Sequence, residues 1–255
     1  MSDFIVDAPV IRLETVNSTN NYAASLLELT HPTEGTAILA QFQTLGRGQR
    51  GAMWQSETGK NLLLSIILYP DFMEAGAQFD LSRAISLAVF HAIMDTCENQ
   101  EIRNVLKIKW PNDLYLAGKK LGGILIENSL KGKNIDSCVV GIGINVDQQH
   151  FGSLDAISIS QITGRSGLTE VLFLNLRQRI QDYYFKLRKS GITEIRDEYE
   201  AYLFGKEEEL PYQSGYQLIK AKVIKTMPEG GLILYGQGKQ YGPFQPREIQ
   251  LLQLS

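Results

Sequence analysis

Cysteine and histidine are both scarce in this sequence. The 255 residues include only Cys97 and Cys138, each inside an apolar run. We expect them to be buried free thiols in a reducing compartment, rather than a disulfide, a metal site or a nucleophile. His31, His91 and His150 fall in a turn, a predicted helix and a loop, without metal-ligand spacing or a nucleophile elbow nearby. Ser-His-Asp hydrolysis therefore has little support.

Excess charge and long apolar runs are also missing. The net charge of −3 provides no bulk attraction to nucleic acid or to an anionic membrane. No apolar run approaches the roughly 20 residues that span a bilayer. The first residues, "MSDFIVDAPVIRLE", lack the basic start and apolar core of a signal peptide. We therefore expect a cytoplasmic protein with one large domain or two unequal ones.

The pattern along the chain changes near residue 206. Helices are predicted over 17–30, 79–100, 168–190 and 192–204, with Asp80 capping the second and Gly191 ending the third. Strands are predicted over 35–43, 61–70, 105–111, 121–129 and 136–146, with 112–120 as a hairpin-like connection. The strand 61–70 is apolar on both faces, which places it centrally in a sheet. After residue 206, short alternating strands predict a small all-β domain, so we predict domains 1–205 and 206–255.

The stretch "QTLGRGQRGAMW" (43–54) matches a dinucleotide-binding fingerprint, because Gly46, Gly48 and Gly51 fit G-x-G-x-x-G. That fingerprint requires a helix to begin at the third glycine, where the pyrophosphate binds. Here a second turn and a strand follow instead, so a Rossmann site is not expected. A phosphate loop is also absent, since "TGKN" lacks the upstream glycine spacing and the hydroxyl residue.

The same stretch carries two permanently charged side chains, Arg47 and Arg50. One interpretation is a solvated turn with incidental arginines. The density of glycine instead favours a flap that orders over an anionic ligand and clamps its oxygens. Trp54 would pack on a flat or apolar part of that ligand, or simply fill the core.

Glycines also interrupt two predicted strands. In a regular strand, Lys120 and Gly122 share one face of "KKLGGILIE", and Gly141, Gly143 and Asn145 share one face of "VVGIGINV". Such glycines predict the floor of a flat ligand slot, although bulges or tight packing explain them equally well.

Polar groups follow the predicted strand 105–111 in "KWPND". Asn112 and Asp113 lie where they would bind a base edge or, through Asp113, a magnesium ion. Taken alone, "PND" is an ordinary turn.

Five motifs taken in order resemble the biotin protein ligases. They are "STN" (18–20), "GRGQRG" (46–51) with Trp54, "KWPND" (109–113), "KKLGGIL" (119–125) and "GIGIN" (141–145). The resemblance implies an α+β fold: a mixed sheet with helices, related to class II aminoacyl-tRNA synthetases, followed by an SH3-like barrel. It implies an enzyme that forms biotinyl-5′-AMP from biotin and MgATP. The biotinyl group then passes to a lysine of a biotin carboxyl carrier domain.

The resemblance also implies site residues. Catalytic roles fall to Lys120 and Arg47. The implied biotin-binding residues are Ser18, Thr19, Asn20, Gln43, Gly46, Arg47, Gly48, Arg50, Lys120, Gly122 and Gly123. The implied ATP- and adenylate-binding residues are Arg50, Trp54, Lys109, Asn112, Asp113, Lys120, Gly143 and Asn145, with Asp113 also the candidate metal ligand.

Two features distinguish this chain within the resemblance. Many bacterial relatives have an arginine that helps retain the adenylate where this chain has Gln49. Only 17 residues precede Ser18, too few for the helix-turn-helix domain of relatives that repress transcription, so we expect a monofunctional ligase without direct DNA binding. A lipoate–protein ligase and a non-enzymatic biotin sensor are the alternatives, and a homodimer stays open.

Overall fold

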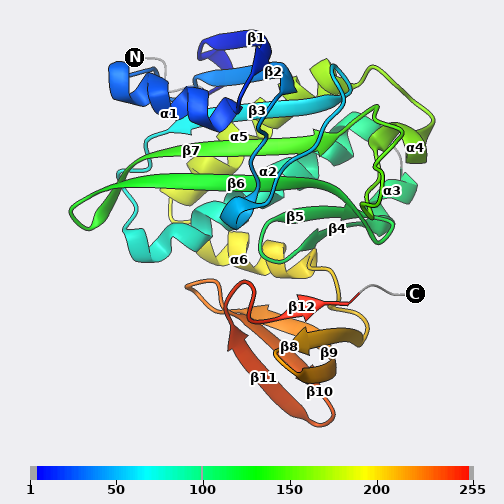
Figure 1. Ribbon diagram of the computed structural model, residues 1–255. Coiled ribbons are helices and arrows are strands. Elements are labelled where there is room, and N and C mark those ends of the chain that lie inside the picture. Colours follow the sequence, from blue (N-terminus) through cyan, green and yellow to red (C-terminus); the bar gives the residue numbers. More distant parts are fainter. Residues whose placement is uncertain (1–4, 99, 253–255) are drawn as a thin grey trace.

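Two β-sheets and two layers of helices make up the structure, a computed structural model that describes residues 5–98 and 100–252 (Figure 1). A seven-stranded sheet has the order β1-β2-β3-β7-β6-β5-β4. Its β1–β2 pair is parallel and its other pairs are antiparallel, which confirms the predicted mixed sheet. The strands are β1 (Val10–Val16), β2 (Ala37–Gln43), β3 (Asn61–Leu68), β4 (Leu106–Lys109), β5 (Asp113–Leu116), β6 (Lys119–Lys131) and β7 (Asn134–Asn145).

Helices cover both faces of this sheet. On one face, the long helices α2 and α5 pack over the main core. On the other face, α1 packs on a smaller cluster around Ala23, Ile38, Ile67 and Val139. The helices are α1 (Thr19–Leu29), α2 (Gln78–Cys97), α3 (Gln100–Val105), α4 (Ile159–Thr163), α5 (Thr169–Arg188) and α6 (Ile192–Ala201), with 3-10 turns η1 (Ile5–Asp7), η2 (Gln49–Gly51) and η3 (Ala75–Ala77).

The strand β3 is central, as predicted, and all of its residues are buried. Its two neighbours in the sheet are β2 and β7. Within the described ranges, no helix is both long enough and apolar enough to cross a membrane.

The second sheet is antiparallel with the order β11-β10-β9-β8-β12. Its strands are β8 (Leu210–Ser214), β9 (Gln217–Thr226), β10 (Leu232–Gly236), β11 (Lys239–Phe244) and β12 (Gln250–Leu251). It lies below α6 in Figure 1. This small β unit follows the predicted change of pattern, while the division into domains 1–205 and 206–255 stays a prediction.

Hydrogen bonds from α2 and from the segment after β4 hold the second sheet against the rest of the protein. Arg83 on α2 donates to the Thr226 hydroxyl at 2.9 Å and to the Met227 carbonyl at 2.5 Å. The indole of Trp110 donates to the Gly230 carbonyl at 2.8 Å. The second contact connects the β unit to the "KWPND" segment, which positions part of the site described below.

The prediction that Asp80 caps a helix is wrong. The helix α2 starts at Gln78 because the turn η3 leads directly into it, and Ala77 is its N-cap. Asp80 lies within the first turn, where the positive end of the helix dipole stabilises a carboxylate. It is buried between two guanidinium groups, accepting from Arg83 at 2.6 Å and from Arg196 at 2.7 Å.

Two other local predictions are also wrong. The helix predicted to end at Gly191 ends at Arg188, and the left-handed residue is Ser190, with φ of 71°. Gly191 is needed for close packing, since a Cβ there would lie 2.6 Å from Lys186 Cγ. The connection 112–120 contains the strand β5, which inserts between β4 and β6.

Candidate functional site

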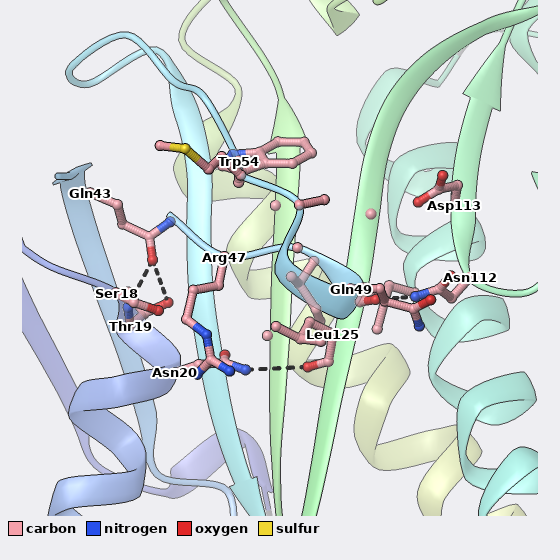
Figure 2. Close-up of a pocket in the computed structure, with 18 of the residues that line it drawn as sticks. Ser18, Thr19, Asn20, Gln43, Arg47, Gln49, Trp54, Asn112, Asp113 and Leu125 are labelled. Atoms are coloured by element: carbon pink, nitrogen blue, oxygen red, sulfur yellow. Dashed lines mark hydrogen bonds between the residues drawn. The ribbon is translucent and has the colours of Figure 1, made fainter. Parts of the chain in front are cut away.

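A cavity of about 280 Å³ lies on the face of the large sheet that carries α1. Its roof is the lid segment, the name used here for residues 46–54, and its floor is formed by β6 and β7 (Figure 2). The lining residues include members of all five sequence motifs, which are separate in the chain. They are Ser18, Thr19, Asn20, Gln43, Arg47, Gly48, Gln49, Ala52, Met53, Trp54, Leu64, Pro111, Asn112, Asp113, Lys120, Gly123, Ile124, Leu125, Gly141, Ile142 and Gly143.

The start of α1 forms one end of the cavity. Ser18 is the N-cap residue, yet its hydroxyl makes no capping hydrogen bond, so it is available to the cavity that it lines. Gln43 Oε1 accepts from the Thr19 backbone N–H at 2.8 Å and lies 3.2 Å from the Thr19 hydroxyl. Because this oxygen is used by Thr19, the amide nitrogen of Gln43 is the group left to bind a ligand carbonyl.

Behind this end lie two residues that the sequence analysis missed, Ser65 and Glu127. The hydroxyl of Ser65 lies 2.6 Å from Asn20 Oδ1 and 2.8 Å from Thr19 Oγ1. The amide of Asn20 donates to Glu127 Oε2 at 2.8 Å. A buried serine within the otherwise apolar "LLLSIIL" of β3 was the available signal, because a buried hydroxyl requires a partner.

The lid segment is a short hairpin. Trp54 N donates to Gly46 O at 2.9 Å, and Gly48 N donates to Ala52 O at 2.7 Å. The side chain of Arg47 extends to Glu127, with its two nitrogens 2.6 and 3.2 Å from the carboxylate oxygens. Arg47 lines the cavity, and its charge is shared with a carboxylate of β6, so its catalytic and biotin-binding roles stay predictions. The side chain of Arg50 lies outside the described structure, so its role stays a prediction.

Two glycines of β7 form part of the floor of the cavity, and neighbouring side chains pack directly on both of them. A Cβ on Gly141 would collide with the side-chain amide of Asn20, and a Cβ on Gly143 would lie 2.7 Å from Trp54 Cε2. Both glycines therefore allow close packing, and both line the cavity. The indole N–H of Trp54 is buried and has no hydrogen-bond partner among the described residues. It is a spare donor beside the cavity.

The opposite end of the cavity carries an ion pair. Lys120 Nζ lies 2.8 Å from Asp113 Oδ1, and both side chains are partly exposed. The side-chain amide of Asn112 is buried and donates to the Ile124 carbonyl, which fixes the loop that presents Asp113. In Figure 2, Asn112 and Asp113 lie on the side of the cavity away from Gln43.

The expectation that Lys120 and Gly122 share a face is wrong. The β5–β6 register shifts, since Leu114 pairs with Gly122 but Tyr115 pairs with Lys120. This bulge adds one residue and reverses the alternation, so Gly123 shares the site face with Lys120. A Cβ on Gly123 would lie 3.0 Å from Asp113 Oδ1. Gly122 is buried against Ile144 instead and does not line the cavity.

Two predicted nucleotide-binding residues lie beside the cavity rather than in it. Lys109 Nζ donates to the Tyr115 hydroxyl at 2.9 Å. Burial lowers the pKa of Lys109, and the carboxylates of Asp113 and Asp155 oppose that shift. Lys109 lines a neighbouring cavity of about 380 Å³ between the two sheets, which also includes Asp113. Asn145 is buried and donates to Ile157 O at 3.1 Å.

The arrangement defines a class of site: an elongated pocket with neutral hydrogen-bonding groups at one end and a lysine–carboxylate pair at the other. The described residues contain no group of three or more His, Cys, Asp or Glu side chains that would hold a metal by themselves. The site suits a ligand with a polar head, an apolar body and an anionic tail.

Comparison with known proteins identifies the family. Residues 13–145 match the biotin/lipoate A/B protein ligase family. The chain is 32% identical over 238 residues to the bifunctional ligase/repressor BirA of Bacillus spizizenii, covering 89% of this chain and 70% of that relative. It is 38% identical over 135 residues to the biotin–[acetyl-CoA-carboxylase] ligase of Paracoccus denitrificans, covering 52% and 53% of the two chains. The chain belongs to the biotin/lipoate A/B protein ligase family.

A solved structure agrees over nearly the whole chain. The biotin protein ligase from Aquifex aeolicus in complex with biotin and ATP superimposes with a TM-score of 0.77 at 28% identity. The match covers 96% of this chain and 99% of that one, so it includes the second sheet. The predicted α+β fold with a C-terminal β unit is confirmed.

Proposed function

We propose that this protein is an ATP-dependent biotin–protein ligase. It joins biotin to the α-phosphate of ATP, giving biotinyl-5′-AMP and pyrophosphate, and then transfers the biotinyl group to a lysine of a biotin carboxyl carrier domain. The observation that carries this proposal is the single cavity whose ends match the two ends of biotin. Family membership and the relatives named as biotin ligases support it.

The ureido ring of biotin presents one carbonyl acceptor and two N–H donors. The end of the cavity at Ser18, Thr19 and Gln43 offers hydroxyl groups and a free amide nitrogen, which complement such a ring. The apolar side chains of Leu64, Ile124 and Ile142, which line the cavity, would contact the flat fused rings. A ligand without the ureido groups would leave buried polar atoms unpaired, at a cost of about 1–3 kcal/mol each.

The chemistry belongs at the other end. The valeryl chain would bring its carboxylate toward Lys120, where the α-phosphate of ATP would meet it. Lys120 and Gly123 both line the cavity, and a Cβ on Gly123 would lie 3.5 Å from the ammonium nitrogen of Lys120. There the ammonium group would stabilise the negative charge that develops as the carboxylate attacks phosphorus. The same charge would steady the leaving pyrophosphate.

Magnesium would be held jointly by the protein and the nucleotide. Asp113 supplies one carboxylate at the cavity, which fits the habit of Mg²⁺ of binding one or two carboxylates together with substrate phosphates and water. A bound Mg²⁺ would shield phosphate charge. Asp113 is also the partner of Lys120, so both groups lie where the phosphates are expected.

A lipoate–protein ligase is the alternative within the family. Lipoate carries an apolar dithiolane in place of a ureido ring, and the polar groups around Gln43 and Thr19 would then lack partners. The relatives named above are biotin ligases, which supports the biotin assignment. A non-enzymatic biotin sensor would have no use for the ion pair of Lys120 and Asp113 at the far end.

Family membership does not establish several features of the proposed function. They are the carrier-domain acceptor, the cytoplasmic location, the lack of direct DNA binding and the possibility of a homodimer, and all four stay predictions. Two buried free cysteines, Cys97 and Cys138, are in keeping with a reducing compartment.

One incubation tests the proposal. The protein is mixed with ATP, magnesium, labelled biotin and a biotin carrier domain, and label on the carrier lysine is measured. We expect label that depends on ATP and on the acceptor lysine. A parallel incubation replaces the labelled biotin and the biotin carrier domain with labelled lipoate and a lipoyl carrier domain. Labelling there but not with biotin would establish the alternative, and labelling in neither incubation would refute both.

A further inference from the structure

A continuous line of hydrogen bonds runs beneath the cavity from Gln43 to the lid segment. Gln43 Oε1 is bound by Thr19, and the hydroxyl of Thr19 lies 2.8 Å from that of Ser65. Ser65 Oγ is 2.6 Å from Asn20 Oδ1, and Asn20 Nδ2 is 2.8 Å from Glu127 Oε2. Glu127 in turn holds Arg47. We call Thr19, Ser65, Asn20 and Glu127 the relay.

Donors and acceptors assign a direction to the relay. Asn20 Oδ1 only accepts, so the single proton of Ser65 is donated to it. The amide group of Asn20 is thereby oriented with its nitrogen toward Glu127. The Thr19 hydroxyl then has two possible acceptors, Gln43 Oε1 at 3.2 Å and Ser65 Oγ at 2.8 Å. The orientation of Asn20 therefore depends on Ser65 at its oxygen and on Glu127 and the Leu125 carbonyl, 3.4 Å away, at its nitrogen. The position of Glu127 depends in turn on Asn20.

Burial makes the relay rigid at its centre. Ser65 is 0% exposed, and Thr19 and Asn20 are each 3% exposed. A buried polar group that loses its partner keeps the full cost of desolvation, so these groups hold their geometry. Gly141 provides the necessary space, because any Cβ there would strike the amide of Asn20.

The far end of the relay fixes the lid segment. The guanidinium of Arg47 makes a two-pronged contact with Glu127 and donates to Asn21 Oδ1 at 2.7 Å. A planar guanidinium with three acceptors has one orientation. The backbone of Arg47 is bridged to Met53 on the other arm of the lid hairpin. Holding the Arg47 side chain therefore holds the hairpin as a unit.

We propose that Glu127 and Ser65 are positioning residues that fasten the lid segment over the end of the cavity at Gln43. Glu127 binds the lid, and Ser65 sets the amide orientation through which Asn20 places Glu127. The coupling of this fastening to bound biotin rests on the proposed function, but the fastening itself does not. Arg47 thus acts chiefly by binding Glu127 and so holding the lid segment in place.

Tryptic cleavage after Arg47 and Arg50 reports on lid opening. We expect Glu127→Gln to raise the rate of cleavage at these two bonds about two- to fivefold, which is the range for a half-exposed ion pair. The matched control is Glu170→Gln, since Glu170 makes the same two-pronged contact with Arg12 at 2.6 and 3.0 Å away from the lid. We expect it to leave lid cleavage unchanged, with melting temperatures of both variants measured alongside.

Ser65→Ala tests transmission through the relay. It should raise lid cleavage although Ser65 does not contact Arg47, and the double variant with Glu127→Gln should cleave no faster than Glu127→Gln alone. Equal cleavage in wild type and Glu127→Gln would overturn the proposal. If the two substitutions multiply each other's effect on the cleavage rate in the double variant, Ser65 does not act through Glu127. Repeating the cleavage with biotin present tests the proposed function separately. If biotin slows lid cleavage in neither the wild type nor the variants, the proposed function fails, while the role of Glu127 in holding the lid segment is unaffected.

Discussion

The indole ring of Trp54 lies directly on the backbone of Gly143, so closely that a single added carbon at residue 143 would be 2.7 Å from Cε2. The contact joins the lid segment to the floor of the cavity. Trp54 was expected either to pack on a ligand or to fill the core, and here it covers the strand that forms the floor. The glycine is required for that contact.

Gly143→Ala should therefore weaken biotin binding. The methyl group must displace the indole, and overpacking of this kind costs about 1–3 kcal/mol, or roughly a 5- to 150-fold loss of affinity. Titration calorimetry with biotin measures the effect. Gly76→Ala is the control, because a Cβ on Gly76 meets nothing within 4 Å. Equal affinities in the two variants would mean that Trp54 does not shape the biotin site.

Lys120→Ala should slow adenylate formation about 10²- to 10³-fold, with little effect on folding. It removes the charge expected to stabilise the transition state and leaves Asp113 without its partner at 2.8 Å. Single-turnover release of pyrophosphate is the measurement. Lys119→Ala, at the exposed neighbouring position, is the control. If both variants release pyrophosphate at the wild-type rate, Lys120 has no catalytic role.

Gln49→Arg should prolong retention of the adenylate. Gln49 lines the cavity, and a charged donor there would bind a phosphate oxygen about 1 kcal/mol more strongly than a neutral one, or roughly fivefold. The half-life of labelled biotinyl-5′-AMP on the enzyme measures this. Gln41→Arg, at an exposed position of β2, controls for net charge. A half-life unchanged by Gln49→Arg would show that residue 49 does not contact the intermediate.

Much of the site could be predicted because its residues lie in short contiguous motifs. "STN", "GRGQRG" and "KWPND" each contribute residues that meet in one cavity. Gly122 was misplaced because period-two alternation carries no information about a bulge, and the bulge depends on how β6 pairs with β5.

The partners of these motifs were harder to predict. The sequence contains many glutamates, and nothing in the residues around Glu127 distinguishes it as the partner of Arg47. Asp80 was taken for a cap because Arg196, one of its two partners, is 116 residues away in the chain and reaches it only in the folded protein. Arg47 and Glu127 are 80 residues apart in the chain, so both pairings follow from tertiary structure.

Alkaline pH should destabilise the protein, in part through Cys97. Burial raises the pKa of this thiol from 9.0 to about 11. Above pH 9 the thiol ionises in the unfolded chain first, so the free energy of unfolding should fall by about 1 kcal/mol per pH unit until about pH 11. Denaturant titrations from pH 8 to 11 measure the slope. Cys97→Ala should show a shallower slope, and an unchanged slope would remove Cys97 as a contributor.

The central claim is that one cavity, roofed by residues 46–54 and floored by Gly141 and Gly143, holds biotin and the nucleotide together. A crystal structure of the protein with biotin and a non-hydrolysable ATP analogue tests this most directly. We predict the ureido ring against Gln43 and the biotin carboxylate beside Lys120 and the α-phosphate. Biotin bound elsewhere, with the lid segment contacting neither ligand, would contradict the account.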